Sequence, residues 1–151
     1  MKMKNICTGA LLMFVAVNIV VLIVKGLRPG IPAVTADDRS DRLIVYYFHR
    51  KARCPPCRNI EVYSHEAVAT SFPAEVGDSR IEWKVVDFEE PENQCFVEDF
   101  ELLAPSVVLV EMRGGVRKRW KSLPEVWELV GDKPAFIAFV QKEVQAFLNT
   151  K

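Results

Sequence analysis

The sequence predicts an α/β fold in which helices flank a mixed β-sheet. Two apolar runs rich in β-branched and aromatic residues, 43–49 and 81–88, lie on either side of a helical pattern. They are therefore expected to be parallel strands joined by a crossover helix. Two more strand-like runs, 106–112 and 116–122, are separated by a pair of glycines that favours a hairpin turn. The predicted order of elements is β-α-β-α-β-β-α.

Local signals mark the helices. Pro73 interrupts the pattern of the first helix, Pro91 opens a second, and Asp132 is a suitable N-cap for the last. A short helix is expected between Ser122 and Gly131. The apolar stripe of the first helix is Ile60, Ala67, Val68 and Phe72, and the second helix carries Phe96, Val97 and Phe100. The last helix presents Phe136, Phe139, Val140, Val144, Phe147 and Leu148.

The N-terminal region predicts a membrane anchor. Residues 6–24 are 19 residues without a charge, and a helix of that length is about 28 Å long, close to the ~30 Å hydrocarbon core of a bilayer. The predicted organisation is an anchor at 1–26, a tether at 27–42 and a globular domain at 43–149. The alternative is a cleavable signal peptide, because residues 34–36 resemble a small-residue cleavage site.

The charges that flank the apolar run predict its orientation. Lys2 and Lys4, with the N-terminal amine, oppose Lys25 and Arg28, which favours a cytoplasmic N-terminus and an extracytoplasmic domain, periplasmic or at the cell surface.

Lys2, Lys4, Lys25 and Arg28 are four of the 20 basic residues, so the rest of the chain has 16 basic and 20 acidic side chains, a net charge of −4. A domain with this charge is a poor candidate for binding nucleic acid.

The segment HRKARCPPCRN, residues 49–59, carries the chemistry. Cys54 is expected at the end of the first strand, and Pro55 and Pro56 suit the first turn of the helix because their missing N–H groups would have no partner there. The first amide that the motif can offer is then that of Cys57, which can face the Cys54 sulfur.

These surroundings predict a reactive thiol. A helix N-terminus and nearby cations lower the pKa of a thiol, so Cys54 is the expected nucleophile towards a partner disulfide and Cys57 the resolving thiol. Arg53 and Arg58 flank the motif directly. The whole basic cluster is His49, Arg50, Lys51, Arg53 and Arg58.

Two other readings of the cysteine pair need comparison. A zinc site requires four ligands, but Cys95 stands alone and only His49 and His65 remain, so a metal site would have to use His49, Cys54 and Cys57. The two thiols could instead hold one soft ion such as Cu(I), in an electron-relay or metal-binding accessory module. A purely structural disulfide is weak, because so short a loop removes little entropy from the unfolded chain. Thiol–disulfide exchange is the preferred interpretation.

A strand that ends in C-x-P-C at a helix start, with a proline ahead of the hairpin, resembles the thioredoxin-like fold over residues 43–149. The resemblance implies a cis bond between Ala104 and Pro105, and implies that Pro105 lies against Cys54 and Cys57 and lines the substrate groove. It implies a thiol–disulfide oxidoreductase that needs no cofactor or metal. Its partners would be protein disulfides and a membrane electron donor or acceptor.

The finer pattern also resembles a narrower group, the small bacterial thioredoxin-like proteins associated with nitroreductases (ArsF-type). The stretches that carry this resemblance are YYFHRKARCPPCRNIEVY, WKVVDFEEPEN and WELVGDK. It implies a nitroreductase as a partner.

Two positions depart from thioredoxin. Thioredoxin keeps an aromatic residue before the first cysteine and a buried Asp on the preceding strand, whereas Arg53 stands here and LIVYYF contains no carboxylate. Tyr46, Tyr47 or a more distant Glu are the candidates for the proton pathway of Cys57. Arg53 is expected to stabilise the thiolate, to attract an acidic partner, and to make the pair more oxidising than thioredoxin.

The remaining conspicuous residues are expected to be structural. Cys95 is expected to pack in the interior, because free cysteine is among the most buried residue types, and His65 to lie on a solvated helix face. The basic run 117–120 is expected to protect an edge strand. The three tryptophans are expected in core or edge packing: Trp83, Trp120 and Trp127.

Overall fold

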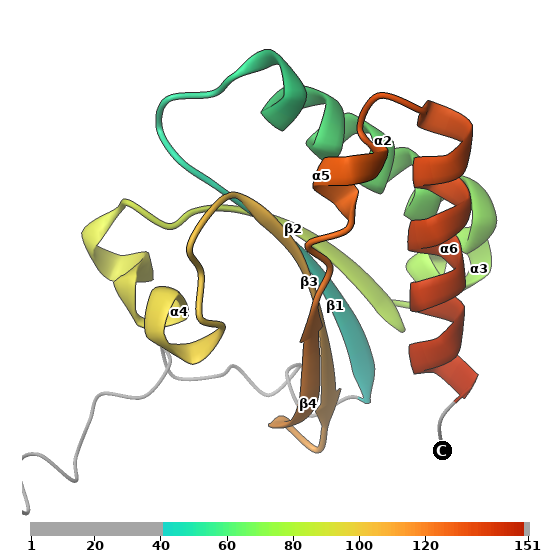
Figure 1. Ribbon diagram of the computed structural model, residues 1–151. Coiled ribbons are helices and arrows are strands. Elements are labelled where there is room, and N and C mark those ends of the chain that lie inside the picture. Colours follow the sequence, from blue (N-terminus) through green and yellow to red (C-terminus); the bar gives the residue numbers. More distant parts are fainter. Residues whose placement is uncertain (1–40, 150–151) are drawn as a thin grey trace, which may run out of the picture. The chain divides into compact units, whose positions relative to one another are not determined.

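The computed structural model describes residues 41–149, drawn in colour in Figure 1. The predicted anchor at 1–26 lies outside the described residues, as does the predicted tether except for residues 41–42. Within the described part of the chain, no helix is long and apolar enough to cross a membrane.

A four-stranded sheet with the order β2-β1-β3-β4 forms the centre of the domain. The strand β1 (Arg42–His49) is parallel to β2 (Ile81–Asp87) and antiparallel to β3 (Ser106–Arg113). A hairpin connects β3 to β4 (Val116–Ser122), with an irregularity in the pairing after Glu111. The predicted parallel pair and the predicted hairpin are both confirmed.

The central strand β1 divides the interior into two apolar clusters. Its residues 43–48 are all buried, and alternation along the strand sends neighbouring side chains to opposite faces. Tyr47, which faces the larger cluster, lies opposite Val85 of β2 and Val107 of β3. Tyr46 and Phe48 face the smaller cluster. A functional group on β1 is therefore fixed to one face by its register.

Helices cover both faces of the sheet, as Figure 1 shows. On the face of the larger cluster lie α2 (Pro55–Ser71), α3 (Pro73–Gly77), α5 (Val126–Leu129) and α6 (Lys133–Asn149). On the other face lie the short helices η2 (Pro91–Asn93) and α4 (Gln94–Asp99). The side chains predicted for the apolar stripe of the first helix are all buried, which confirms that stripe.

The ends of the helices follow the sequence signals, with one exception. Asp132 caps α6 as predicted, because its Oδ1 accepts a hydrogen bond of 3.1 Å from the amide of Ala135. The exception is α3, which was not predicted. Pro73 ends α2 and is also the first residue of α3, a position that suits proline because its missing N–H has no helical partner there.

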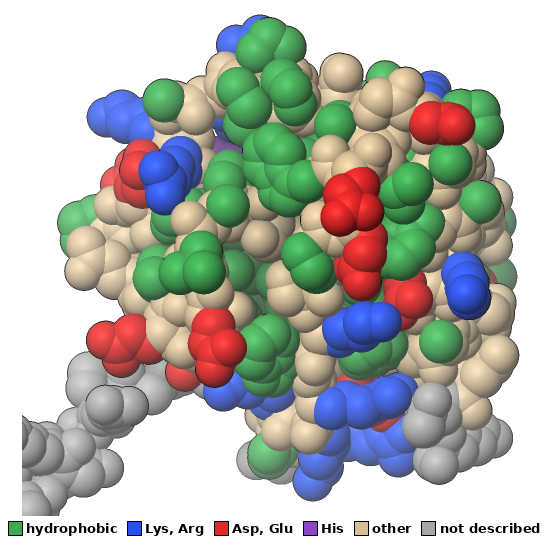
Figure 2. Space-filling view, viewed as in Figure 1, with side chains coloured by type: hydrophobic (Ala, Val, Ile, Leu, Met, Phe, Trp, Pro, Cys, Tyr) green, Lys and Arg blue, Asp and Glu red, His purple; other side chains and the backbone are tan. Residues whose placement is uncertain are grey.

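The edge strand β4 is basic, as predicted for the run 117–120. Each of three cations on it contacts an acid from another element: Arg117 with Asp99, Arg119 with Glu111, and Lys121 with Glu143. Figure 2 shows Lys and Arg side chains gathered at the end of the molecule that carries the β3–β4 turn. Charged side chains of this kind hinder pairing with another chain.

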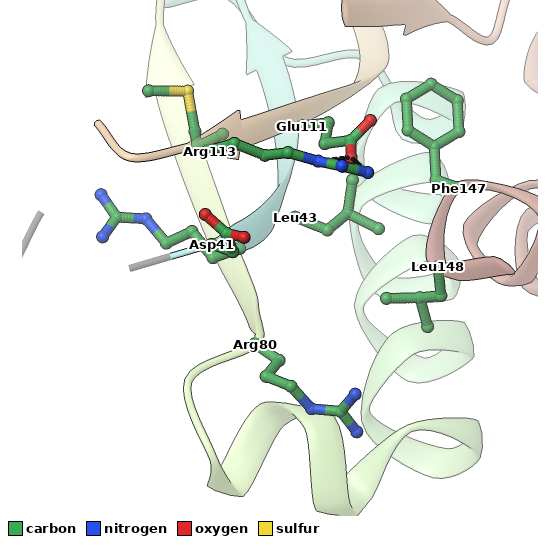
Figure 3. A pocket seen from close by; sticks show the side chains of 9 residues that line it. Asp41, Leu43, Arg80, Glu111, Arg113, Phe147 and Leu148 are labelled. Carbon is green, nitrogen blue, oxygen red and sulfur yellow. Dashed lines mark hydrogen bonds and ion pairs between the residues drawn. The ribbon is translucent and has the colours of Figure 1, made fainter. Parts of the chain in front are cut away.

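A hollow of about 380 Å³ lies at the start of β1, shown in Figure 3. Leu43 lies at its base, and Phe147 and Leu148 approach from α6. Arg113 and Glu111, both on β3, form an ion pair among its lining residues. Because the cysteine pair follows the other end of β1, this hollow is separate from the site described next.

Candidate active site

Cys54 and Cys57 lie at the junction between β1 and α2 and form a disulfide with a Cα–Cα distance of 5.1 Å. Cys54 is the N-cap of α2, and Pro55 and Pro56 occupy the first helical positions. The predicted placement at the helix start is confirmed, but Cys54 is not at the end of the strand as expected, because β1 ends at His49 and residues 50–53 form a loop between them. The pair therefore stands at a helix N-terminus, where backbone N–H groups favour a negative charge.

The two sulfurs have different surroundings. The amide of Cys57 donates to the Cys54 sulfur over 3.2 Å, as predicted from the two prolines. Cys57 is only 5% exposed, whereas Cys54 is partly exposed. A partner disulfide can reach Cys54 more easily than Cys57, which fits a nucleophile and a resolving thiol in that order.

Tyr47 of β1 lies beneath the pair. Its hydroxyl donates a hydrogen bond of 2.6 Å to the carbonyl oxygen of Cys57. Burial raises the pKa of Tyr47 to about 12, with a further increase from the charge of Glu61 and a smaller, opposing effect of Arg53. The phenol therefore stays protonated at neutral pH and acts as a hydrogen-bond donor.

Arg53 and Glu61 form an ion pair beside the disulfide. Arg53 Nη1 donates to Glu61 Oε2, and the two side chains are 27% and 26% exposed. Glu61 lies one helical turn beyond Cys57, in the second turn of α2. The ion pair therefore connects this turn to Arg53, the residue before the C-P-P-C motif. Sequence reasoning named only a distant Glu, although the spacing of four residues from Cys57 was a usable signal.

The basic cluster is partly neutralised by acids. Arg50 lies 4.0 Å from Glu89, and its guanidinium donates to the carbonyl oxygen of Leu103 over 3.3 Å. The amide of Lys51 also donates to Glu89. Within residues 41–149, the side chains of Lys51 and Arg58 make no ion pair. These two cations, and not Arg53, are the ones available to a partner.

The loop before β3 lies at the same edge of the sheet as the cysteine pair. Pro105 is buried, Ala104 is partly buried, and the next residue, Ser106, pairs with Phe48 near the end of β1. The indole N–H of Trp127 donates to the carbonyl oxygen of Pro105 over 2.8 Å. Trp127 of α5 thereby fixes the loop.

The predicted cis bond between Ala104 and Pro105 is wrong. No peptide bond among the described residues is cis. The trans bond is the lower-energy isomer, by about 0.5–1 kcal/mol for X-Pro, and the loop adopts it.

Leu103 is an exposed apolar residue in this loop that sequence reasoning missed. Its side chain is 90% exposed, the highest fraction among the exposed large apolar residues of the described chain. Only the adjacent Ala-Pro pair indicated that this segment belongs to the site.

Three other sequence expectations can be compared with the structure. In residues 41–149, no three potential metal ligands converge, and Cys54 and Cys57 are bonded to each other. The expectation that Cys95 is buried is wrong, because α4 turns Phe96 and Phe100 towards the sheet and leaves Cys95 exposed. His65 is exposed on α2, as expected.

The topology and the placement of the cysteines together decide the fold class. A parallel β-α-β unit is followed by an antiparallel hairpin, and a C-P-P-C disulfide caps the helix that leaves the central strand. The fold is thioredoxin-like. The case for the narrower nitroreductase-associated group lies in the sequence pattern alone.

Comparison with solved structures finds similar thioredoxins at low sequence identity. Thioredoxin O2 from Arabidopsis thaliana is 23% identical, with a TM-score of 0.39 over 64% of this chain and 76% of that one. Fasciola hepatica thioredoxin is 24% identical, with a TM-score of 0.40 over 66% and 86%. Thermus thermophilus thioredoxin is 17% identical, with a TM-score of 0.44 over 68% and 74%. No protein-family model and no curated protein matches the chain.

The raised pKa of Tyr47 predicts a loss of stability at alkaline pH. Between pH 10 and about 12 the unfolded chain loses the phenol proton that the folded state retains, so unfolding becomes more favourable as pH rises. Below pH 10 this contribution is fully present. Urea unfolding measured across this pH range should show that the free energy of unfolding of wild type falls by about 2 kcal/mol more than that of Tyr47→Phe. Parallel pH profiles for the two proteins would contradict the assignment.

Proposed function

We propose that the protein is a thiol–disulfide oxidoreductase that exchanges the Cys54–Cys57 disulfide with partner proteins. One observation carries the proposal: the pair closes as a disulfide across the N-terminus of α2, with one reachable and one buried sulfur. A structural disulfide needs no such asymmetry, whereas stepwise exchange through a mixed disulfide does.

The exchange has two steps in the reducing direction. The Cys54 thiolate attacks one sulfur of the partner disulfide, the partner S–S bond breaks, and one partner thiolate leaves. The Cys57 thiol then loses its proton, attacks the Cys54 sulfur and releases the second partner thiolate. The partner disulfide gains two electrons and the Cys54–Cys57 pair is oxidised by two.

The first step is supported by the helix terminus and by the remaining cations. A thiolate at Cys54 would accept the amide N–H of Cys57 and lie at the positive end of the α2 dipole. Lys51 and Arg58 flank it without ion-pair partners among residues 41–149. Both would favour an acidic protein partner, and the exposed Leu103 would offer it an apolar contact.

Cysteine variants test the activity. Wild type should reduce the interchain disulfides of insulin in the presence of dithiothreitol, whereas Cys54→Ser should abolish turnover because the attacking thiolate is gone. Cys57→Ser should accumulate a mixed disulfide through Cys54, visible by mass spectrometry. Cys95→Ser is the matched control and should retain full activity, since Cys95 lies outside the site. Activity in Cys54→Ser would reject the proposal, and retention of a soft metal by wild type would favour the carrier function instead.

The reduction potential tests the direction of electron flow. Stabilisation of the Cys54 thiolate favours the reduced form, so the pair should be more oxidising than thioredoxin, at a potential above about −270 mV. Equilibration against glutathione and dithiothreitol buffers gives the value. We expect the protein to act as a reductase of partner disulfides, and a potential near −120 mV would indicate a disulfide-donating oxidant and overturn that direction.

The proposal includes attachment to a membrane with the domain outside the cytoplasm. It is supported by the apolar run at 6–24 and by the positive charges of Lys2 and Lys4. A membrane electron donor or acceptor would then exchange electrons with the pair. The sequence resemblance adds a nitroreductase to the candidate partners.

Fractionation tests the attachment. The full-length chain should stay with membranes after alkaline carbonate extraction, whereas a chain that begins at residue 37 should be released. Protease added to intact spheroplasts should digest the domain. Release of the full-length chain by carbonate would reject the anchor, and protection from protease would reverse the orientation.

A further inference from the structure

The second step of exchange requires a proton acceptor that the fold does not supply in an obvious way. Cys57 attacks as a thiolate, but it is 5% exposed, so bulk water has little access to its proton. No carboxylate stands on β1, the strand that passes beneath it. A carboxylate acceptor must therefore come from another element of the site.

Neither tyrosine of β1 can fill this role. Tyr46 faces the smaller cluster on the opposite side of the sheet, where its ring stacks on Phe48 at a centroid distance of 5.1 Å. Tyr47 is on the correct face but donates its proton to the carbonyl oxygen of Cys57 and, with its raised pKa, keeps that proton. His49, at the end of β1, is hydrogen-bonded through Nδ1 to the carbonyl oxygen of Arg50 at an exposed position. A carboxylate of α2 that contacts the C-P-P-C segment is the stronger candidate.

Glu61 has the required position. It follows Cys57 by four residues in α2, and side chains with this spacing lie on the same helix face with Cβ atoms about 5–6 Å apart. Helix side chains also lean towards the N-terminus, which directs Glu61 back along Cys57. Its ion pair with Arg53, the residue before Cys54, shows that the carboxylate extends in this direction.

The electrostatic surroundings of Tyr47 agree with this position of Glu61. The charge of Glu61 raises the pKa of the phenol, and that phenol is bonded to the Cys57 backbone. The Glu61 carboxylate is therefore close enough to act electrostatically on a group in contact with Cys57.

The other carboxylates of α2 and of the elements beside it are engaged elsewhere or exposed. Glu66 of α2 pairs with Lys133 of α6, and Glu75 of α3 pairs with Arg80. Other charged and titratable groups of the segments around the start of α2 are Tyr47 and His49 of β1, Arg50, Lys51, Arg53 and Arg58, Glu89, which contacts Arg50 and the Lys51 amide, and the exposed Glu125 and Glu128 of the α5 region. Arg53 is the one with a direct contact to Glu61.

We propose that Glu61 accepts the proton of the Cys57 thiol during resolution of the mixed disulfide, directly or through one water, and that Arg53 holds the carboxylate in position. The Cys57 S–H bond breaks, its proton passes to Glu61, and the thiolate forms a bond to the Cys54 sulfur. The Cys54–partner S–S bond breaks and the partner leaves as a thiolate. The proton on Glu61 then passes to solvent. This inference rests on the proposed function.

Two-phase thiol release tests the proposal. The full-length chain in detergent, with Cys7→Ser and Cys95→Ser to remove the other thiols, is reduced and mixed with excess nitrobenzoate disulfide reagent. Attack by Cys54 releases a first coloured thiolate at a rate that depends on reagent concentration. Resolution by Cys57 releases a second at a rate that does not, so the two steps are measured separately.

Glu61→Gln should slow the second phase about 100-fold at pH 7, within the range for loss of a general base. The first phase should not be slowed, because the variant only frees Arg53 from its ion pair beside Cys54. In Glu61→Gln the rate of the second phase should rise about tenfold per pH unit between pH 6 and 8, because the Cys57 thiol must ionise without a base. The rate of the second phase in wild type should change little over the same range. Glu61→Asp, which keeps a carboxylate, should be intermediate. Glu66→Gln is the matched control, because it removes a similar ion pair from the same helix and should match wild type.

The outcomes distinguish a failure of the role assigned to Glu61 from a failure of the proposed thiol–disulfide exchange. If the second phase of Glu61→Gln stays within twofold of wild type, Glu61 is not the acceptor, although exchange itself occurs. Equal slowing of both phases would assign Glu61 a structural role and overturn the proposal. Absence of a second phase in wild type would instead reject the proposed function.

Discussion

The site depends on Cys54 serving as the N-cap of α2. An N-cap side chain normally accepts a hydrogen bond from the second or third residue of the helix. Here Pro55 and Pro56 occupy the first two positions and have no N–H, so the amide of Cys57 is the donor that remains. The two prolines thus aim one backbone dipole at the reactive sulfur and keep the second cysteine within bonding distance of it.

The central strand connects this helix start to the core. Tyr47 has no exposed surface and belongs to the larger apolar cluster, and its hydroxyl donates a hydrogen bond to the Cys57 carbonyl oxygen. A shift of one residue in β1 would send Tyr47 to the other face and replace it with Tyr46 or Phe48. The register of β1 with its two neighbouring strands therefore also sets the hydrogen bonding beneath the disulfide.

Local patterns were sufficient to predict most elements and the position of the cysteine pair, because strand alternation, prolines and caps act over a few residues. The contact between Arg53 and Glu61 could not be predicted in the same way, since it depends on how two side chains are directed across the first turns of α2. The expectation for Cys95 failed for a related reason. Cysteine is often buried, but the orientation of α4 is set by Phe96, which packs against the sheet. The neighbouring Cys95 is therefore left exposed.

The number of cations in the motif overstates the positive field that acts on Cys54. Arg53 shares its charge with Glu61 and Arg50 with Glu89, so each pair has little net charge at a distance. Stabilisation of a Cys54 thiolate then depends mainly on the Cys57 amide and the helix terminus, which are fixed by the backbone and do not vary with salt as exposed cations do. The same ion pair that removes Arg53 from the thiolate holds a carboxylate beside Cys57. One contact thus reduces the help given to the first step of exchange and supplies the group that the second step needs.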